Sequence, residues 1–259
     1  MAFTLDQFRL DGKVAVVTGA GGRGNSIGRA YALGLAAAGA SVVVADLDGA
    51  GAERVAAEIA ASGGKSAGVQ VDIAERASVD AMAAFVAERF GGADILVNNA
   101  AIMSEMLLSR AIDYPLAEWN RMLAVNVTGA LNCCQALVPQ MRVRGGGRIV
   151  NQVSGGAFPA GSVYGITKLA LTGLTTTLAT ELGKEGIHVN AIAPGSTASD
   201  ARNAMTATSL PFRALMEQVV TMRYEGQPDE LVGALLLLCS PAGSWIHGQV
   251  LHVDGGWIL

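Results

Sequence analysis

The chain has 259 residues, of which 51% are hydrophobic and only 15% are charged, and its formal net charge is −4. That balance gives no basic surface for nucleic acid or anionic lipid, and it suits a parallel β-sheet covered on both faces by helices. At this length we expect one α/β domain over residues 1–259, whose partners are small molecules and copies of itself.

The cysteines and the amino-terminal segment indicate the setting in which the protein works. Cys133 and Cys134 are adjacent and Cys239 stands alone, so their spacing predicts neither a disulfide framework nor a metal site. The first residues carry charges throughout and contain no apolar core of signal-peptide length. Fully apolar stretches fall short of the ~20 residues of a membrane span. We therefore expect a reduced, cytoplasmic protein without a metal and without a membrane segment.

Strand and helix patterns alternate along the chain without a linker or a low-complexity tract. Because such alternation builds a parallel sheet with right-handed crossovers, we expect an α/β fold of the Rossmann type. Its sheet would be doubly wound, mainly parallel and seven-stranded, with helices on both faces. The predicted strands are 13–20, 41–48, 66–71, 93–97, 147–153, 187–193 and 248–253. The predicted helices are 29–40, 49–62, 76–90, 116–142, 162–184 and 228–239.

A glycine-rich loop, GGRGNSIG, connects the first predicted strand to the first helix and ends at Gly28. Glycines let the backbone approach a pyrophosphate, and a helix N-terminus offers unpaired N–H groups. Asp46 lies near the end of the second strand, where a carboxylate accepts the ribose hydroxyls of NAD and repels the 2′-phosphate of NADP. An ordinary tight turn is the plain alternative for the loop alone. The whole unit predicts dinucleotide binding with NAD(H) preferred over NADP(H), although Arg23 in the loop can pair with a phosphate.

Tyr164 and Lys168 stand four positions apart in the motif YGITK, at the start of a predicted helix. Positions i and i+4 share a helix face, so we expect the ammonium of Lys168 to lie beside the phenol and to lower its pKa. A phenol tuned in this way donates and accepts protons in alcohol and ketone chemistry. The spacing alone also fits a surface Tyr and a solvated Lys, so the interpretation depends on the other motifs.

Together these motifs resemble the short-chain dehydrogenase/reductase family, from about residue 10 to the C-terminus. The matching segments are TGA at 18–20, VDI around Asp72, NNAA at 98–101, VNVTG around Asn126, VNQVS ending at Ser154, YGITK, and NAIAPG at 190–195. The resemblance implies that Tyr164 is the acid and base, that Ser154 orients the substrate oxygen, and that Lys168 and Asn126 complete a proton relay. It implies cofactor contacts at Gly19, Arg23, Ser26, Ile27, Gly28, Asp46, Leu47, Asp72, Ile73, Asn99, Ala100, Tyr164, Lys168, Pro194, Gly195 and Ser199.

The chain departs from the family pattern at several positions. The glycine loop is longer than usual and Ser26 replaces its middle glycine, which resembles the enoyl reductases of the same superfamily. Those enzymes space their Tyr and Lys by seven positions, whereas Leu171 stands at that distance here, so enoyl reduction is the weaker interpretation. The short interval between Ser154 and Tyr164 predicts a tight connecting loop. Ser199 keeps the hydroxyl of the Thr that bonds the nicotinamide amide in many relatives.

Three segments correspond to the substrate pocket of the family, namely 102–115, 155–161 and the substrate loop at about 197–225. The first two predict a largely apolar secondary alcohol or ketone. The third also contains Arg202 and Arg213, so a 3-oxoacyl-thioester (acyl-carrier) reductase remains an alternative. A catalytically silent dinucleotide-binding regulator is a second alternative. The apolar side chains of the first two segments are Ile102, Met103, Met106, Phe158 and Pro159.

Two further groups of residues have structural interpretations. The helix ALTGLTTTLATEL at 170–182 is rich in small side chains, and the C-terminal DGGWIL is apolar. With the family resemblance, these features predict a homotetramer. We expect the remaining ring side chains to serve packing or an interface, and these are His188, His247, His252, Trp119, Trp245 and Trp257.

Overall fold

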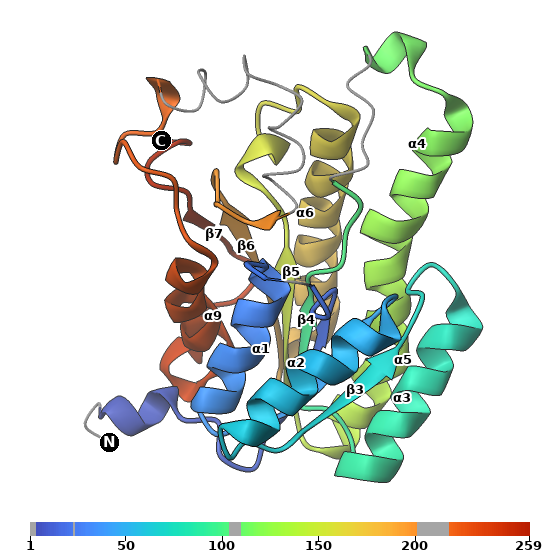
Figure 1. Ribbon diagram of the computed structural model, residues 1–259, viewed down its shortest axis with the longest axis vertical. Coiled ribbons are helices and arrows are strands. Elements are labelled where there is room, and N and C mark those ends of the chain that lie inside the picture. The colour runs from blue at the N-terminus through green and yellow to red at the C-terminus, as the bar shows by residue number, and fades with distance from the viewer. Residues whose placement is uncertain (1–3, 23, 104–109, 201–217) are drawn as a thin grey trace.

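Seven parallel strands form the centre of the protein, and helices cover both faces of the sheet (Figure 1). The computed structural model describes residues 4–22, 24–103, 110–200 and 218–259. The strand order is β3-β2-β1-β4-β5-β6-β7, and each neighbouring pair is parallel. The predicted doubly wound Rossmann-type fold is therefore confirmed. The strands are β1 (Val14–Thr18), β2 (Ser41–Asp46), β3 (Ser66–Gln70), β4 (Ile95–Asn98), β5 (Gly147–Gln152), β6 (Ile187–Pro194) and β7 (Val250–Val253).

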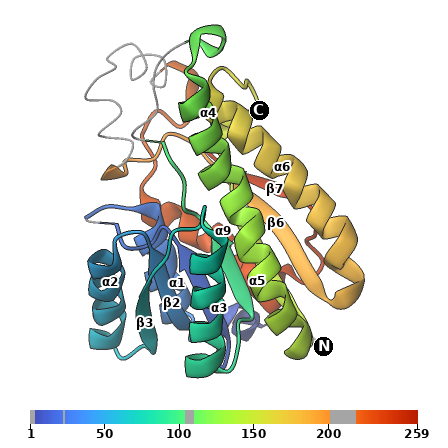
Figure 2. The same cartoon turned by 90° about the vertical axis from the view of Figure 1, so that its right-hand side faces the viewer.

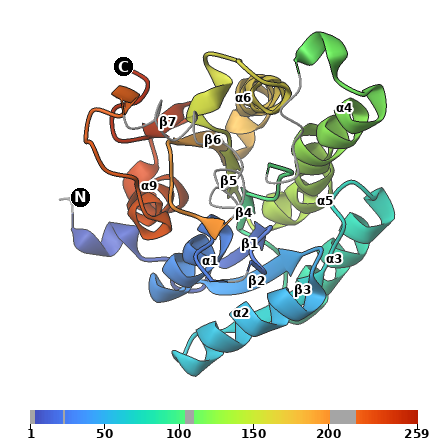
Figure 3. The ribbon, with the colours of Figure 1, turned by 45° about the horizontal axis from the view of Figure 1, so that its top comes forward.

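Two helical layers enclose the sheet, as Figure 3 shows. Side chains alternate along a strand, so neighbours such as Ile149 and Val150 of β5 belong to different buried clusters on opposite faces. Both faces of the sheet are therefore packed, which explains why the strands are apolar at successive positions. One layer contains α1 (Ile27–Ala37), α2 (Gly49–Ala61) and α9 (Val232–Cys239), and the other contains α3 (Arg76–Phe90), α5 (Ala130–Val143) and α6 (Val163–Leu182).

The long helix predicted over 116–142 contains a π-helical turn. The helix α4 (Leu116–Leu123) passes through the turn Ala124–Gly129 into α5, and Figure 2 shows the two helices as one continuous column. By length and composition the span Leu116–Val143 is able to cross a membrane, but half of its most apolar stretch is buried inside the protein. Such burial is typical of a core helix. Single π-turns inside α-helices often mark functional sites.

Most predicted elements differ from the structure by a few residues at their ends, and two of these differences have a clear cause. β1 stops at Thr18, because Gly19 has a φ of +65° and turns the chain. A Cβ at Gly19 would lie 2.6 Å from the Ala100 Cα, so only glycine lets the loop pack against the segment after β4. The helix predicted over 228–239 begins as a 3₁₀ turn, Pro228–Leu231, and continues as α9.

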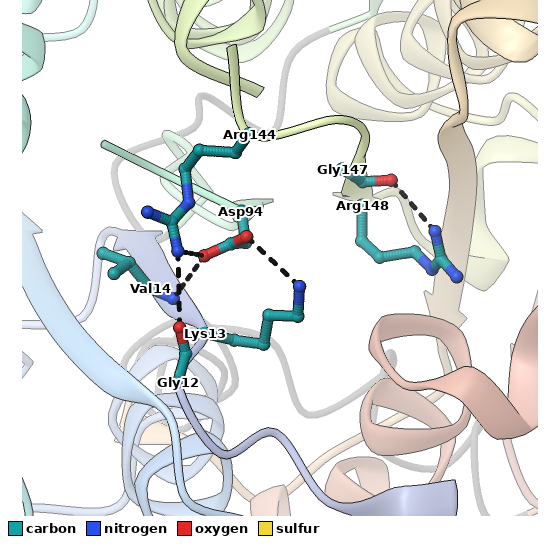
Figure 4. A network of polar contacts seen from close by, with 7 residues as sticks. All are labelled: Gly12, Lys13, Val14, Asp94, Arg144, Gly147 and Arg148. Atoms are coloured by element: carbon teal, nitrogen blue, oxygen red, sulfur yellow. Dashed lines mark hydrogen bonds and ion pairs between the residues drawn. The ribbon is translucent and has the colours of Figure 1, made fainter. Parts of the chain in front are cut away.

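Asp94 gathers charged groups at the amino-terminal edge of the sheet (Figure 4). Its carboxylate accepts hydrogen bonds from the Val14 N–H at 2.9 Å and from Lys13 Nζ at 3.4 Å, and it lies 2.7 Å from Arg144 Nη2. Arg144 also donates to the Gly12 carbonyl at 3.3 Å. The network ties the start of β1 to the chain before β4 and after α5. It is structural, because parallel sheets bind ligands at the opposite, carboxyl-terminal edge.

Candidate active site

A cavity of about 780 Å³ lies at the carboxyl-terminal edge of the sheet, where open parallel sheets bind ligands. Segments that follow all seven described strands line it, together with the first turns of α1 and α6, the end of α4 and the π-turn. Among the candidate residues from the sequence, Asn126 is not on its wall and Arg23 lies outside the described residues. The cavity wall includes Gly19, Ser26, Ile27, Gly28, Asp46, Leu47, Asp72, Ile73, Asn99, Ala100, Ser154, Tyr164, Lys168, Pro194, Gly195 and Ser199.

The glycine loop presents bare backbone to this cavity. A Cβ at Gly28 would lie 2.3 Å from the Gly19 carbonyl oxygen and 2.5 Å from Asn99 Nδ2. Ser26 caps α1, because its Oγ accepts a hydrogen bond from the Arg29 N–H at 3.3 Å. The N–H groups of a helix's first turn have no partner within the helix. The loop and the start of α1 therefore suit an anionic phosphate.

Asn99 fastens the glycine loop to the end of β4. Its Nδ2 donates to the carbonyl oxygens of Thr18 and Gly19, each at 2.9 Å. Its backbone N–H donates to Thr18 Oγ1 at 3.1 Å. The Asn99 side chain therefore shapes the turn, and its expected contact with the cofactor stays a prediction.

Asp46 lies at the end of β2 with its carboxylate held by backbone donors. Oδ2 accepts from the Gly21 N–H at 2.8 Å, and Oδ1 accepts from the Asp48 N–H at 3.0 Å. A carboxylate oxygen accepts more than one hydrogen bond, so both oxygens keep the capacity to bind hydroxyl groups in the cavity. Leu47 follows with 65% of its side chain exposed, and it adds no charge at this end.

Tyr164 and Ser154 meet where β5 ends and α6 begins. The Ser154 side chain interacts with the Tyr164 phenol, and Ser154 Oγ accepts from the Gly156 N–H at 3.1 Å. Ser162 caps α6 through the Gly165 N–H at 3.0 Å, which places Tyr164 in the first helical turn. The predicted tight loop is confirmed, because Ala160 between the two residues has a φ of +47°.

Lys168 is buried one helical turn after Tyr164. Its Nζ lies 5.6 Å from the centroid of the Tyr164 ring and donates to the Gln152 carbonyl at 2.8 Å. Burial lowers the pKa of Lys168 to about 7. Burial raises the pKa of Tyr164, and only the interaction with Ser154 opposes the rise. The expectation that Lys168 lowers the Tyr164 pKa is therefore wrong for this structure, because the ammonium is itself desolvated and held by a carbonyl of β5.

Asn126 lies in the π-turn with 1% of its surface exposed. Its Oδ1 accepts from the Ile102 N–H at 2.8 Å, and its Nδ2 donates to the Ile102 carbonyl at 3.2 Å and to Thr167 Oγ1 at 3.0 Å. These bonds join the segment after β4 to α6. Because the side chain is engaged, the expected role in a proton relay would fall to the Asn126 backbone carbonyl.

Comparison with known proteins identifies the family. Residues 22–258 match the family model described as Enoyl-(Acyl carrier protein) reductase. An uncharacterized oxidoreductase of Mycobacterium tuberculosis is 44% identical over 249 residues, which cover 96% of this chain and 98% of that protein. The 7alpha-hydroxysteroid dehydrogenase of Escherichia coli is 37% identical over 259 residues, which cover 99% of this chain and 98% of that protein. The chain belongs to the short-chain dehydrogenase/reductase family.

Structures of similar members of the family contain different cofactors. A 7alpha-hydroxysteroid dehydrogenase with NADH and 7-oxo glycochenodeoxycholic acid has a TM-score of 0.89 at 36% identity, covering 98% of each chain. A gluconate 5-dehydrogenase from Burkholderia cenocepacia with NADP and tartrate has a TM-score of 0.90 at 34% identity, covering 98% of each chain. A 3-oxoacyl-[acyl-carrier-protein] reductase of Synechocystis is 37% identical, covering 96% of this chain and 98% of that protein. As a short-chain dehydrogenase/reductase, the protein is an oxidoreductase that acts on CH–OH groups.

Asp72 and Ser199, which are predicted to contact the cofactor of this short-chain dehydrogenase/reductase, also lie in contacts within the protein. Asp72 Oδ1 accepts from the Ala74 N–H at 2.9 Å, so the side chain supports the turn after β3. Ser199 is only 5% exposed and lies beside Asp200, whose N–H donates to the Asn25 carbonyl at 2.9 Å. The glycine loop and the segment after β6 therefore touch.

Sequence reasoning missed several residues on the cavity wall, among them Trp257 and Gln152, and misplaced two others. Trp257, expected in packing or an interface, lines the cavity, and so does Gln152. The expected pocket residues Phe158 and Pro159 are not on that wall, and the Phe158 ring packs 4.6 Å from the His252 ring instead. Met106 lies outside the described residues. A glycine pair directly after Ser154, at 155–156, was the available signal that a large side chain from elsewhere packs there.

The wall fits a nicotinamide dinucleotide. The glycine loop leaves backbone free for a pyrophosphate, and Asp46 offers acceptors for hydroxyl groups. Gln152 adds a buried Oε1 without a hydrogen-bond partner, and a buried acceptor of this kind is costly unless a ligand donates to it. The residues that would hold the cofactor therefore extend from the start of α1 to the end of β5.

Proposed function

We propose that this protein is an NAD(H)-dependent oxidoreductase that interconverts a secondary alcohol and a ketone on a largely apolar substrate. The observation that carries the proposal is the convergence around Tyr164. Ser154 and Tyr164 lie together on the cavity that the glycine loop and Asp46 also line, and Lys168 Nζ lies 5.6 Å from the centroid of the Tyr164 ring. A protein that only binds a dinucleotide has no need of this arrangement.

The chain's own residues manage the proton and the position of the substrate oxygen. The nicotinamide, when bound, supplies or accepts the hydride. In reduction, the Tyr164 hydroxyl protonates the forming alkoxide, and in oxidation the same oxygen removes the alcohol proton. Ser154 hydrogen-bonds the substrate oxygen and orients it. The N-terminal end of α6 adds a positive dipole end beside Tyr164, which favours negative charge on its oxygen.

Lys168 and Asn126 serve the proton after it reaches Tyr164. With a pKa of about 7, buried Lys168 exchanges a proton near neutral pH. Asn126 holds α6 in place through Thr167. We propose that its backbone carbonyl, in the π-turn, accepts a hydrogen bond from a water that carries protons between Lys168 and the solvent.

The proposed preference for NAD(H) rests on Asp46. Its carboxylate is held by the N–H groups of Gly21 and Asp48, so it cannot easily turn away from a 2′-phosphate. The test is Asp46→Asn, because Ala would also remove acceptors from the loop. We expect the ratio of kcat/KM for NADPH to that for NADH to rise at least tenfold, as loss of repulsion between close like charges implies. An unchanged ratio, or a native preference for NADPH, would show that Asp46 does not select the cofactor.

The test of the activity is a panel of ketones and secondary alcohols, followed by nicotinamide absorbance with each cofactor. Turnover of apolar ketones supports the proposal. A 3-oxoacyl reductase, the alternative that the Synechocystis relative favours, would instead reduce 3-oxoacyl thioesters best. Binding of NADH without turnover of any member would favour a silent regulator. Enoyl reduction is not proposed, because Leu171 stands where those enzymes carry their Lys.

We also propose a cytoplasmic homotetramer. β7 is an edge strand of the described sheet, and on α6 Leu169 is 45% exposed beside small residues. Burial raises the pKa of Cys134 and of Cys239 to about 12, which suits unreactive thiols in a reducing compartment. Light scattering at micromolar concentration should report four chains, and a stable monomer would contradict the assembly.

A further inference from the structure

Trp257 is the large side chain that packs against the backbone directly after Ser154. A Cβ at Gly155 would lie 2.6 Å from Trp257 Cε3 and 2.8 Å from Cζ3, and a Cβ at Gly156 would lie 3.7 Å from Cη2. The benzene half of the indole therefore covers both glycines. Trp257, Gly156, Ser154 and Tyr164 all line the cavity.

The segment that carries Trp257 is fastened within itself and to the end of β6. Asp254 accepts from the N–H groups of Gly256 and Ile258, each at 2.9 Å. The Gly195 N–H donates to the Val253 carbonyl at 3.1 Å, and a Cβ at Gly195 would lie 2.5 Å from the Asp254 Cα. These contacts leave the turn after β7 little freedom.

A second segment holds the same turn from the other side. Thr221 Oγ1 donates to the Gly256 carbonyl at 2.9 Å, and the Met222 N–H donates to the Gly255 carbonyl at 3.0 Å. The indole is thus a fixed part of the wall beside the Ser154 and Tyr164 pair.

The cavity wall around Trp257 is apolar, and its surface is flat. The basic residues on the described lining are engaged elsewhere, since Lys168 donates to the Gln152 carbonyl and Arg121 pairs with Glu118. Gly156 adds no side chain. An indole offers a broad, flat apolar surface, on which a rigid ring system can pack.

Resting on the proposed function, we propose that Trp257 is the residue that sets substrate selectivity, and that the enzyme takes alicyclic secondary alcohols and ketones. The ring system of the substrate packs on the indole while its oxygen reaches Ser154 and Tyr164. An acyclic chain of the same size gains less from the flat surface, because it must be ordered before it packs. If Trp257 only supports the fold, its removal would affect both kinds of substrate alike.

The experiment compares 2-decalone with 2-decanone, which carry ten carbons in two rings and in one chain. Wild type, Trp257→Ala, Trp257→Phe and Trp245→Phe are measured, and Trp245 is the control because it is 98% exposed. We expect Trp257→Ala to lose about tenfold in kcat/KM on 2-decalone and less than about threefold on 2-decanone, as loss of an aromatic contact implies. The kcat/KM of Trp257→Phe on 2-decalone should lie between the values of wild type and Trp257→Ala, and Trp245→Phe should match wild type. The NADH Kd should change less than about twofold in all three variants.

Calorimetric binding of each ketone to the NAD⁺ complex separates this inference from the proposed function. No hydride transfers there, because ketone and cofactor are both oxidised. If wild type binds 2-decalone without reducing it and Trp257→Ala weakens that binding, the inference stands and the proposed function fails. If wild type reduces ketones but Trp257→Ala weakens both ketones equally or neither, the inference fails and the proposed function stands. A wild type that binds 2-decalone no better than 2-decanone also overturns the inference.

Discussion

Gly28→Ala tests the physical argument for the dinucleotide site most directly. The new methyl group would lie 2.3 Å from the Gly19 carbonyl oxygen, 2.5 Å from Asn99 Nδ2 and 2.9 Å from the Ala20 Cα. Two of these atoms belong to backbone, so α1 or the glycine loop must move. Such overpacking costs about 1–3 kcal/mol, against a gain of at most about 1 kcal/mol from the helix propensity of alanine.

The same movement displaces the first N–H groups of α1 from the cavity wall. Loss of one hydrogen bond to a charged group costs about 1.5–3 kcal/mol, which corresponds to a rise of roughly 10- to 100-fold in the NADH Kd. NADH fluorescence titration gives the Kd, and urea unfolding gives the free energy of unfolding.

The matched control is Gly233→Ala in α9, where a Cβ would meet nothing within 4 Å. It should leave the NADH Kd unchanged and raise the free energy of unfolding by up to about 1 kcal/mol. If Gly28→Ala binds NADH as tightly as wild type and unfolds at the same urea concentration, the loop is not the phosphate site that we infer.

Three further predictions concern the groups around the reacting oxygen. Tyr164→Phe should lower kcat at least 100-fold while the NADH Kd changes less than about twofold, since the hydroxyl carries the proton and the ring only packs; a variant that keeps most of its rate would refute the assignment. Burial lowers the pKa of Lys168 to about 7 from an ordinary value of 10.5. Between these two pH values Lys168 is protonated in the unfolded chain and largely neutral in the folded protein. The free energy of unfolding should therefore rise with pH from about 7 toward 10.5. Urea unfolding of the cofactor-free protein between pH 7.5 and 9.5 should show that the Lys168→Met variant lacks this rise. If the free energy of unfolding changes with pH in the same way in the variant and in wild type, Lys168 is not the group that causes the rise. Asn126→Ala leaves the Ile102 backbone N–H and carbonyl without their side-chain partner, whereas Thr167 keeps its bond to the Tyr164 carbonyl. The variant should lower the free energy of unfolding by about 2–3 kcal/mol; a smaller loss than in Thr167→Val would show that Asn126 does not hold these segments together.

Asn126 shows how little of a residue's surroundings the sequence reveals. The motif VNVTG marked it, through the family resemblance, as part of a proton relay. The structure places it in a π-turn and engages its side chain with Ile102 and Thr167. Those partners lie 24 and 41 positions away, and no local pattern connects them.

The pKa of Tyr164 shows a second limit. The spacing of Tyr164 and Lys168 predicted one helix face correctly, but it carried no information on how deeply that face is buried. Desolvation grows with the number of surrounding groups from distant segments, and it reverses the expected direction of the shift.

The alternation of strands and helices was sufficient for the fold, and the family resemblance supplied the candidate residues of the cavity wall. Alternating apolar strands and helices allow few ways to bury both faces of a sheet, and parallel strands bring their carboxyl ends to one edge. For that reason Asp46, Asp72, Ser154 and Pro194 could be placed together from sequence. Trp257 could not, because its place depends on the turn after β7 packing on Gly195 and Gly155. Only the tertiary structure decides which distant side chain fills the space that a glycine leaves.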